Sequence, residues 1–295
     1  MMGGLKSFAQ RVRVSDGVYG TEFHRRGLSP SYRPELLNLE DPEAVEAVAR
    51  SYVEAGSDVI LTNTLSAHRF GLAAAGLARQ AAHVAETAAC IACKAVRGTD
   101  VRVFGSFGPS GKIVMMGEVG REELMAAFAE TAEALAWGGA EAIVLETFTE
   151  LAEAEIALAA AKKACDLPVV VSMSFDSGPG KTFTMMGNKP GDLAAMAGKG
   201  GAAGVGANCG TGPLEHVAVA RLLREATDLP VWIKPNAGLP VVKGGATSFP
   251  MGPGEFASFV PSLIEAGADF IGGCCGTTPD HIRAVRMAVD SADAR

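Results

Sequence analysis

Short β-rich runs alternate with helical segments eight times along the chain of 295 residues. Each of these runs contains a stretch of consecutive apolar residues rather than a strict alternation, which is typical of parallel strands buried on both faces. Eight strand–helix units favour an α/β fold of the closed (β/α)₈ kind, a TIM barrel, that occupies residues 1–295 as a single domain. A doubly wound open sheet is the alternative. The runs are Val12–Gly17, Asp58–Thr64, Val101–Gly108, Glu141–Thr147, Pro168–Phe175, Gly204–Gly210, Pro230–Gly238 and Phe270–Thr277.

The segments between these runs are rich in alanine and show helical periodicity. Asp41 and Thr278 each precede a proline, so each can cap a helix that has this proline as its first residue. A longer helical segment covers 68–97, where Gly76 is the candidate break. The remaining helices are expected at approximately 120–138, 149–164, 190–199, 213–227 and 253–266.

Composition and charge exclude several classes of protein. Hydrophobic residues make up 48% of the chain and charged residues 20%, which is an ordinary globular balance. The net charge is −7 and no run is rich in lysine or arginine, so a nucleic-acid or anionic-membrane partner is not expected. No segment has the apolar length of a signal peptide or a membrane span. We therefore predict a cytoplasmic protein, in which the six cysteines stay reduced.

Polar side chains gather at the C-terminal ends of the predicted strands, which is where barrels of this type carry their active sites. A strand end needs only a turn, and glycine with a few polar residues would suffice for it. Three cysteines, two acids and several asparagines and threonines are therefore difficult to explain as packing. They are Asp16, Thr62, Asn63, Thr64, Ser106, Glu146, Asn208, Cys209, Asn236, Cys274 and Cys275.

The three cysteines have the pattern of a metal site. Cys274 and Cys275 are adjacent, and the glycines around them relax the backbone so that both sulfurs could turn toward the barrel mouth. Cys209 ends the sixth strand, and even-numbered strands can contribute to one interior layer. Three thiolates with one open position form a catalytic zinc site, and sulfur ligands favour zinc over magnesium or calcium. Buried structural cysteines are the alternative.

The chemistry of such a site follows from its open position. Zinc held by three thiolates can take a substrate thiol as the fourth ligand and deprotonate it, and the bound thiolate is then a nucleophile toward an activated methyl group. A purely structural zinc site is less favoured, because a closed site needs four firm ligands. No Ser-His-Asp arrangement is evident, and the five histidines are interpreted as surface or packing residues: His24, His68, His83, His216 and His281.

The strand-end segments resemble those of the homocysteine S-methyltransferases. The resemblance runs from about Asp16 to Ile282 and implies that Cys209, Cys274 and Cys275 bind zinc, that homocysteine accepts the methyl group and that methionine is the product. The segments that carry it are Asp16–Thr21, Thr62–Thr64, Glu146–Thr147, Asn208–Gly210 and Gly272–Ile282, the last of which reads GGCCGTTPDHI.

Within this family, the segment PNAGLP at Pro235–Pro240 is most similar to the homocysteine-binding module of cobalamin-dependent methionine synthase. That similarity implies that Asn236 is a labile fourth ligand, which homocysteine displaces. The alternative is that Asn236 only shapes a turn.

The amino-acid end of the substrate needs its own partners. The resemblance implies that Asp16 and Glu146 bind its ammonium group, although each acid could instead cap a helix or brace a loop. The substrate carboxylate could accept hydrogen bonds from the backbone N–H groups of Gly17 to Thr21. Thr64 and Ser106 are further candidates for lining the pocket.

The methyl donor is less constrained than the acceptor. One barrel accounts for the whole chain, so the folate barrel and cobalamin domain of a full methionine synthase are not expected within it. The donor is then a methyl-corrinoid on a partner protein, or a small onium compound such as S-methylmethionine. Two other hypotheses are methyl transfer to another small thiol, and a homocysteine-binding subunit that is inactive outside a larger corrinoid complex.

Overall fold

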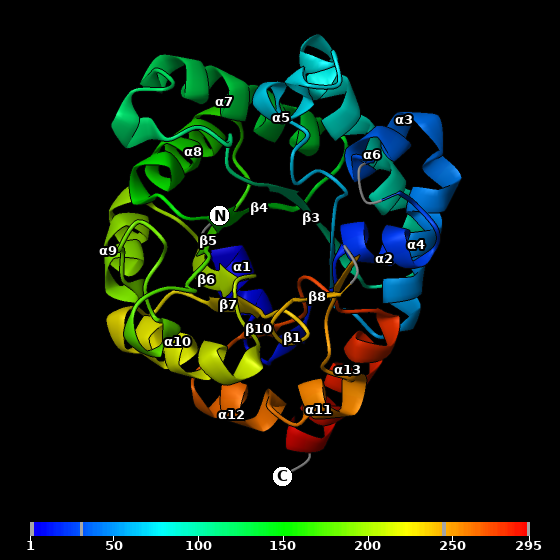
Figure 1. The fold of residues 1–295 in the computed structure, drawn as a ribbon, viewed down its shortest axis with the longest axis vertical. Helices are drawn as coiled ribbons and strands as arrows, with labels where there is room; N and C mark the ends of the chain where they lie inside the picture. The colour runs from blue at the N-terminus through cyan, green and yellow to red at the C-terminus, as the bar shows by residue number, and fades with distance from the viewer. Residues whose placement is uncertain (1–2, 30–31, 244–245, 294–295) are drawn as a thin grey trace.

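The computed structural model describes residues 3–29, 32–243 and 246–293. Eight parallel strands form one sheet in the order β1-β10-β7-β6-β5-β4-β3-β2. A bridge between Ser15 and Val59 joins the two ends of this order, so the sheet closes into a (β/α)₈ barrel as predicted and the open sheet is excluded (Figure 1). The strands are β1 (Arg13–Val14), β2 (Val59–Leu61), β3 (Arg102–Phe107), β4 (Ala142–Phe148), β5 (Val169–Met173), β6 (Gly204–Asn208), β7 (Val231–Lys234) and β10 (Phe270–Ile271).

Helices surround the barrel, and two of their starts match the sequence signals (Figure 1). The Asp41 side chain caps its helix by accepting a hydrogen bond from the Ala44 N–H at 3.1 Å. The last helix begins at Pro279. The α-helices are α1 (Gly3–Phe8), α2 (Tyr19–Arg25), α3 (Leu37–Glu40), α4 (Pro42–Glu54), α5 (Arg69–Ala73), α6 (Ala81–Ala95), α7 (Arg121–Trp137), α8 (Leu151–Ala164), α9 (Pro190–Gly200), α10 (Pro213–Ala226), α11 (Pro253–Ala257), α12 (Val260–Glu265) and α13 (Pro279–Asp293). Within the described ranges, no helix is both long and apolar enough to cross a membrane.

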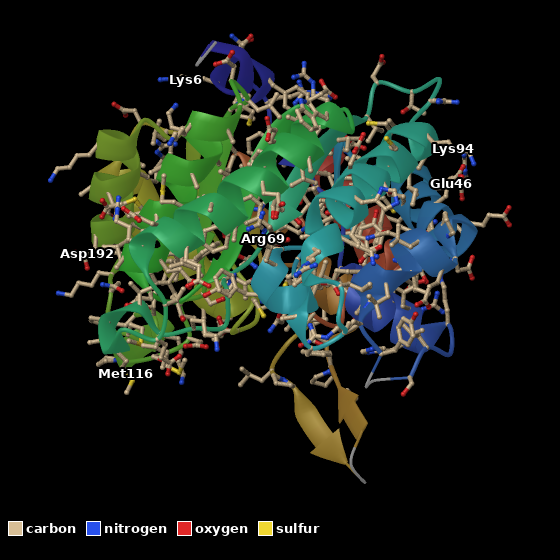
Figure 2. All side chains as sticks on the ribbon, turned by 90° about the horizontal axis from the view of Figure 1, so that it is seen from above. Lys6, Glu46, Arg69, Lys94, Met116 and Asp192 are labelled. Atoms are coloured by element: carbon tan, nitrogen blue, oxygen red, sulfur yellow. The ribbon has the colours of Figure 1, made fainter. Side chains whose placement is uncertain are left out.

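The candidate break of the segment 68–97 is confirmed, since a left-handed turn at Gly76, with φ of 72°, interrupts it. The structure differs from the sequence-based prediction in two places. The segment 253–266 is split between α11 and α12. The strands β8 (Val241–Lys243) and β9 (Ala246–Ser248) form an antiparallel hairpin that the prediction lacked. The hairpin and α1 lie at opposite ends of the barrel, where Lys6 marks the α1 end (Figure 2).

Strand alternation divides the barrel interior into an apolar and a polar level. Side chains two residues apart on one strand face the same side. Buried apolar side chains, with Leu5 of α1 among them, fill the end near α1, and we call them the lower layer: Leu5, Val59, Leu61, Phe104, Ala142, Val144, Val170, Ala203, Trp232 and Phe270. On four strands, the residue two positions after a member of the lower layer is polar and buried. These residues are Ser106, Glu146, Ser172 and Lys234. The functional site is therefore built directly on the lower layer.

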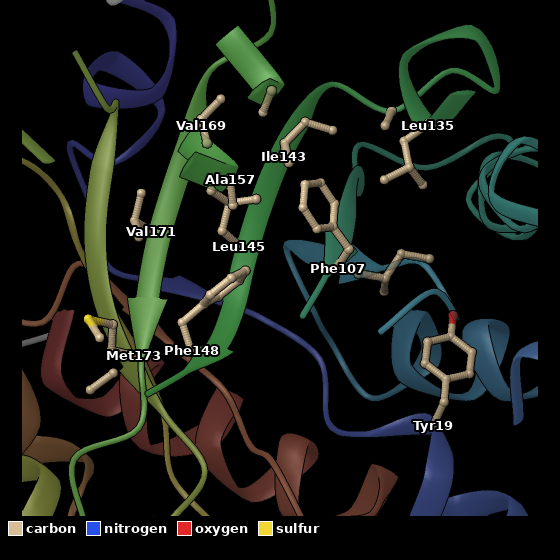
Figure 3. Close-up of a cluster of buried hydrophobic side chains, with 14 of the residues drawn as sticks. Tyr19, Phe107, Leu135, Ile143, Leu145, Phe148, Ala157, Val169, Val171 and Met173 are labelled. Carbon is tan, nitrogen blue, oxygen red and sulfur yellow. The ribbon is translucent and has the colours of Figure 1, made fainter. Parts of the chain in front are cut away.

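The opposite faces of the strands pack against the helices. Ile143, Leu145 and Phe148 of β4 belong to a large apolar cluster that includes Ala157 of α8 and Leu135 of α7 (Figure 3). All five of these side chains are fully buried. This outer shell packs the strands against the helices, and burial of its apolar surface stabilises that contact by about 25 cal/mol per Å².

Buried His68 is expected to make stability fall in acid. Its Nδ1 accepts the Gly71 N–H at 3.1 Å and its Nε2 faces the Pro109 carbonyl oxygen at 3.2 Å, an arrangement that requires the neutral ring. Burial lowers the pKa of His68 to about 4 from an ordinary 6.5. As the pH falls, His68 therefore takes up a proton in the unfolded chain before it does so in the folded protein. The stabilisation that depends on the neutral ring is intact above pH 6.5, and about 3 kcal/mol of it is lost as the pH falls to 4.

The check is urea unfolding at several pH values for the natural chain and for His68→Asn, which keeps a capping acceptor that does not titrate. The difference in unfolding free energy between the two proteins should shrink or reverse between pH 6.5 and 4. Parallel pH profiles for the two proteins would contradict this role of His68.

Candidate metal centre

Three sulfur atoms converge at the C-terminal ends of β6 and β10. The Sγ atoms of Cys209, Cys274 and Cys275 all lie within 4.8 Å of one another, and those of Cys209 and Cys275 are 3.9 Å apart. No other group of three or more potential metal ligands is found in the described part of the chain. The sequence predicted this convergence, and we call these residues the cysteine cluster.

The backbone around the cluster is pinned from neighbouring strands. The Cys209 N–H donates to the Lys234 carbonyl oxygen at 3.1 Å, and the Cys274 N–H donates to the Pro235 carbonyl oxygen at 2.8 Å. Cys209 has a φ of 62°, a left-handed conformation that is costly for a residue with a side chain. Gly276 has a φ of 82°, and a Cβ there would overlap Phe249. These turns carry both strand ends toward the same point.

Hydrogen bonds among the three cysteine side chains shift their pKa values in opposite directions. Hydrogen bonds from the thiols of Cys274 and Cys275 lower the pKa of Cys209 to about 3. The same hydrogen bonding to Cys209 raises the pKa of Cys275 to about 12 and raises the pKa of Cys274. One thiolate is thus stabilised by two thiol protons. A cation of higher charge could take the place of those protons.

The donor set fits a tetrahedral, sulfur-seeking metal ion. A Zn–S bond of about 2.3 Å in a tetrahedron places two sulfurs about 3.8 Å apart. The observed 3.9 Å between Cys209 and Cys275 agrees with this spacing. Three sulfur ligands and no carboxylate within the cluster disfavour magnesium and calcium, which prefer oxygen.

The cysteine cluster opens onto a cavity of about 480 Å³ at the barrel mouth. Eight of the predicted site residues line it, together with His24 and Lys234: Gly17, Thr21, Thr64, Ser106, Glu146, Cys209, Cys274 and Cys275. The structure therefore brings most of the predicted set around one space. Asp16 and Asn236 are not among its lining residues.

Asp16 lies behind the cavity wall in an ion pair with Lys234. The Lys234 Nζ is 2.6 Å from Asp16 Oδ1, and the Leu61 N–H donates to Asp16 Oδ2 at 2.8 Å. Burial lowers the pKa of Lys234, but the charges of Asp16 and Glu146 outweigh burial and raise it. Lys234 is therefore a cation at neutral pH. Burial raises the pKa of Glu146, although Lys234 opposes that shift.

Asn236 holds the second half of the cluster in place. Its Oδ1 accepts a hydrogen bond from the Cys275 N–H at 3.0 Å, and its amide group contributes to the lowered pKa of Cys209. The amide oxygen that would bind a metal thus already accepts one backbone hydrogen bond in this arrangement. The role of Asn236 as a labile ligand stays a prediction.

Comparison with known proteins decides the family of this chain. A family model described as homocysteine S-methyltransferase matches residues 13–289. The chain belongs to the homocysteine S-methyltransferase family. Methionine synthases of Mycobacterium leprae and Mycobacterium tuberculosis are 33% and 32% identical to it, in alignments of 303 positions that cover 97% of this chain. The chain spans about a quarter of the length of these relatives, 25% in each case.

A solved structure agrees with this assignment. The metallated form of the homocysteine methyltransferase MmuM from Escherichia coli superposes with a TM-score of 0.81 at 25% identity. The match covers 97% of this chain and 99% of that one. The resemblance seen in the sequence is therefore confirmed at the level of family and fold.

Two residues of the site received no role in the sequence analysis. Asn208 accepts hydrogen bonds at Oδ1 from the Thr147 N–H at 2.9 Å and the Ser172 hydroxyl at 2.6 Å, and its Nδ2 lies 4.0 Å from Cys274 Sγ. It thus ties β4 and β5 to the cysteine cluster. Lys234 is the other, and its signal was visible: a lysine that ends the otherwise apolar run VWIK of a buried strand.

Proposed function

We propose that this chain is a zinc-dependent methyltransferase that transfers a methyl group to the thiol of homocysteine and forms methionine. The observation that carries the proposal is the cysteine cluster, which opens onto a cavity that also contains the carboxylate of Glu146. A thiol and an ammonium group on one small molecule suit these two features. Family membership and the metallated MmuM structure support the same assignment.

Cys209, Cys274 and Cys275 would hold the zinc ion. When bound, zinc supplies the Lewis acidity that lowers the pKa of a substrate thiol. In the transfer itself, the substrate sulfur forms a bond to the methyl carbon as the donor's bond to that carbon breaks, and the thiol proton leaves to solvent. The cavity wall positions the sulfur for this displacement, which is a proximity effect.

The chain's remaining residues orient the amino-acid end of the substrate. Glu146 faces the ammonium group, and a hydrogen bond from Ser106 holds its carboxylate. The backbone from Gly17 to Thr21 lines the cavity and offers N–H groups to the substrate carboxylate. The Thr21 hydroxyl accepts the Gly276 N–H at 3.2 Å, which ties that turn to the cysteine cluster.

For the donor we propose a methyl-corrinoid on a partner protein or S-methylmethionine. The similarity to methionine synthases, which extends over 97% of this chain, supports the methyl-corrinoid. The structural match to the homocysteine methyltransferase MmuM supports homocysteine as the acceptor with either donor. The need for reduced thiols in the cysteine cluster supports a cytoplasmic location.

Two alternative functions can be distinguished from the main proposal by the same experiment. A subunit that only presents homocysteine inside a corrinoid complex agrees with the similarity to methionine synthases, and another small thiol could enter a cavity of about 480 Å³. Both share the cysteine cluster with the main proposal. They differ in whether the isolated chain forms methionine and in which thiol it prefers.

The deciding experiment incubates the zinc-loaded chain with homocysteine and either methylcobalamin or S-methylmethionine, and measures methionine. Methionine should form with at least one donor and should require zinc. Binding of homocysteine without turnover would favour the presenting subunit. Failure to bind homocysteine, with another thiol binding in its place, would overturn the proposal.

A further inference from the structure

An arginine on the cavity wall has no part in the proposed reaction. Arg33 lines the cavity that the cysteine cluster opens onto. It directly precedes the short 3₁₀ helix η1 (Pro34–Leu36), and its side chain reaches α5, which follows β2. In the ring of eight strands, β2 lies opposite β6, the strand that leads into Cys209. Arg33 therefore belongs to the side of the cavity that faces Cys209.

The Arg33 guanidinium is held in place, but few of its donors are used. Its Nη1 donates to the Gly71 carbonyl oxygen at 2.6 Å, which is the one hydrogen bond of this side chain within the described ranges. A guanidinium has five N–H donors in a fixed fork, so most of them remain for another partner. The helix α5 has the sequence RFGLA and contains no acidic residue, so it offers Arg33 a carbonyl oxygen and no carboxylate.

The acidic residues close to Arg33 in the sequence are engaged elsewhere. Glu35 Oε1 accepts both the N–H and the hydroxyl of Ser66, at 2.9 and 2.7 Å. Glu40 accepts a hydrogen bond from the Tyr32 hydroxyl. Arg33 forms no ion pair within 4.0 Å to any carboxylate in the described part of the chain. Its positive charge therefore has no direct partner at the cavity wall.

A guanidinium of this kind beside a cavity is suited to bind an anion. Burial lowers the pKa of His68 most, and the charge of Arg33 lowers it further, which agrees with a cation that has no counter-charge of its own. Arginine binds carboxylates and phosphates through two parallel N–H···O hydrogen bonds. The cavity of about 480 Å³ has the size of sites that hold drug-sized ligands, so homocysteine leaves space for part of a second molecule.

We propose that Arg33 is an anion-binding residue of this cavity, and that its ligand is a carboxylate or phosphate group on a molecule that enters the cavity. The proposal rests on the proposed function and refines its substrate class. Two sources share this chemistry, namely the carboxylate of homocysteine and an anionic group on the methyl donor. The donor is favoured, because the backbone from Gly17 to Thr21 is already proposed for the homocysteine carboxylate and Arg33 lies across the cavity from Cys209.

Two replacements separate anion binding from the contact with Gly71. Arg33→Gln removes the charge and the fork but keeps an N–H group that can donate to the Gly71 carbonyl oxygen. Arg33→Lys keeps the charge and one such donor but lacks the fork. Arg121→Met is the matched control, because Arg121 begins α7, is exposed and does not line the cavity. Zinc content and urea unfolding, measured on every variant, show whether a replacement has disturbed the metal site or the fold instead.

The experiment uses the zinc-loaded chain and pairs each ligand with an analogue that lacks its anionic group. Homocysteine is paired with 3-aminopropane-1-thiol, and calorimetry measures the binding of both. S-methylmethionine is paired with (3-aminopropyl)dimethylsulfonium, and methylcobalamin with methylcobinamide, which lacks the phosphate. For these donors the KM is measured, or the inhibition constant where no methyl group is transferred.

Arg33→Gln should weaken an anionic ligand by about 10- to 100-fold and the matching analogue by less than about threefold, because hydrogen bonds to charged groups are the strong ones. Arg33→Lys should recover part of the lost affinity, and Arg121→Met should match the natural chain. A selective loss for homocysteine assigns Arg33 to the carboxylate of the acceptor, and a selective loss for a donor assigns it to the donor.

The outcomes that contradict the proposal differ from those that contradict the proposed function. If Arg33→Gln binds all the anionic ligands as the natural chain does, or weakens each ligand and its analogue equally, Arg33 binds no anion and the inference is overturned. A natural chain that neither binds homocysteine nor forms methionine would instead overturn the proposed function.

Discussion

Replacing Cys209 with serine is expected to abolish stoichiometric zinc binding and to lower methyl transfer by at least about 1,000-fold. Loss of a group that only supports a metal ligand typically costs 10- to 100-fold, so loss of a ligand itself should cost more. A serine hydroxyl stays protonated at neutral pH and is a poor ligand for a sulfur-seeking ion. The two remaining sulfurs, on Cys274 and Cys275, cannot close a tetrahedral site by themselves.

The measurement is zinc per chain after dialysis, together with methionine formed from homocysteine and the productive donor. Cys90→Ser is the matched control, since Cys90 is an exposed cysteine on α6 outside the cysteine cluster. This control should keep both zinc and activity. A Cys209→Ser protein that holds one zinc ion per chain and forms methionine at the natural rate would refute the metal site.

The barrel and its cysteine cluster were predictable because they depend on repeating or local patterns. Apolar runs such as Val169–Met173 mark buried strands wherever they occur, and strand ends meet at one edge of a parallel barrel. Cys209 and Cys275 could thus be placed together although 66 residues separate them. The order of the strands followed from closure of the eight units.

The finer arrangement of the site was not predictable, since it depends on contacts between distant strands. The pairing of Asp16 with Lys234 spans 218 positions, and no spacing rule reveals it. The sequence suggests that Asp16 and Glu146 are equivalent, and only the structure shows that Asp16 forms an ion pair with Lys234. The hairpin of β8 and β9 was missed for a different reason: three-residue strands outside the main sheet are too short to give a periodic signal.

The lower layer gives the second large effect, at Trp232. This side chain is fully buried, with ring centroids 5.1 Å from Phe270 and 6.1 Å from Phe104. Trp232→Ala should reduce the unfolding free energy by about 3–5 kcal/mol, because the barrel strands cannot collapse into the space that the ring leaves. Urea unfolding should show a lower midpoint with an unchanged slope.

Trp232→Phe separates the volume of the ring from its polar atom. The Trp232 Nε1 is buried and has no hydrogen-bond partner in the described ranges, so its loss costs little, and phenylalanine fills much of the same space. This variant should stay within about 1.5 kcal/mol of the natural chain. Equal stabilities for the alanine and phenylalanine variants would show that the lower layer is not tightly packed.

The replacement of Trp232 by alanine should also affect the functional site, because the Lys234 Nζ lies 5.8 Å from the Trp232 ring. When alanine replaces Trp232, the ion pair between Lys234 and Asp16 loses the aromatic ring that lies next to the Lys234 ammonium group.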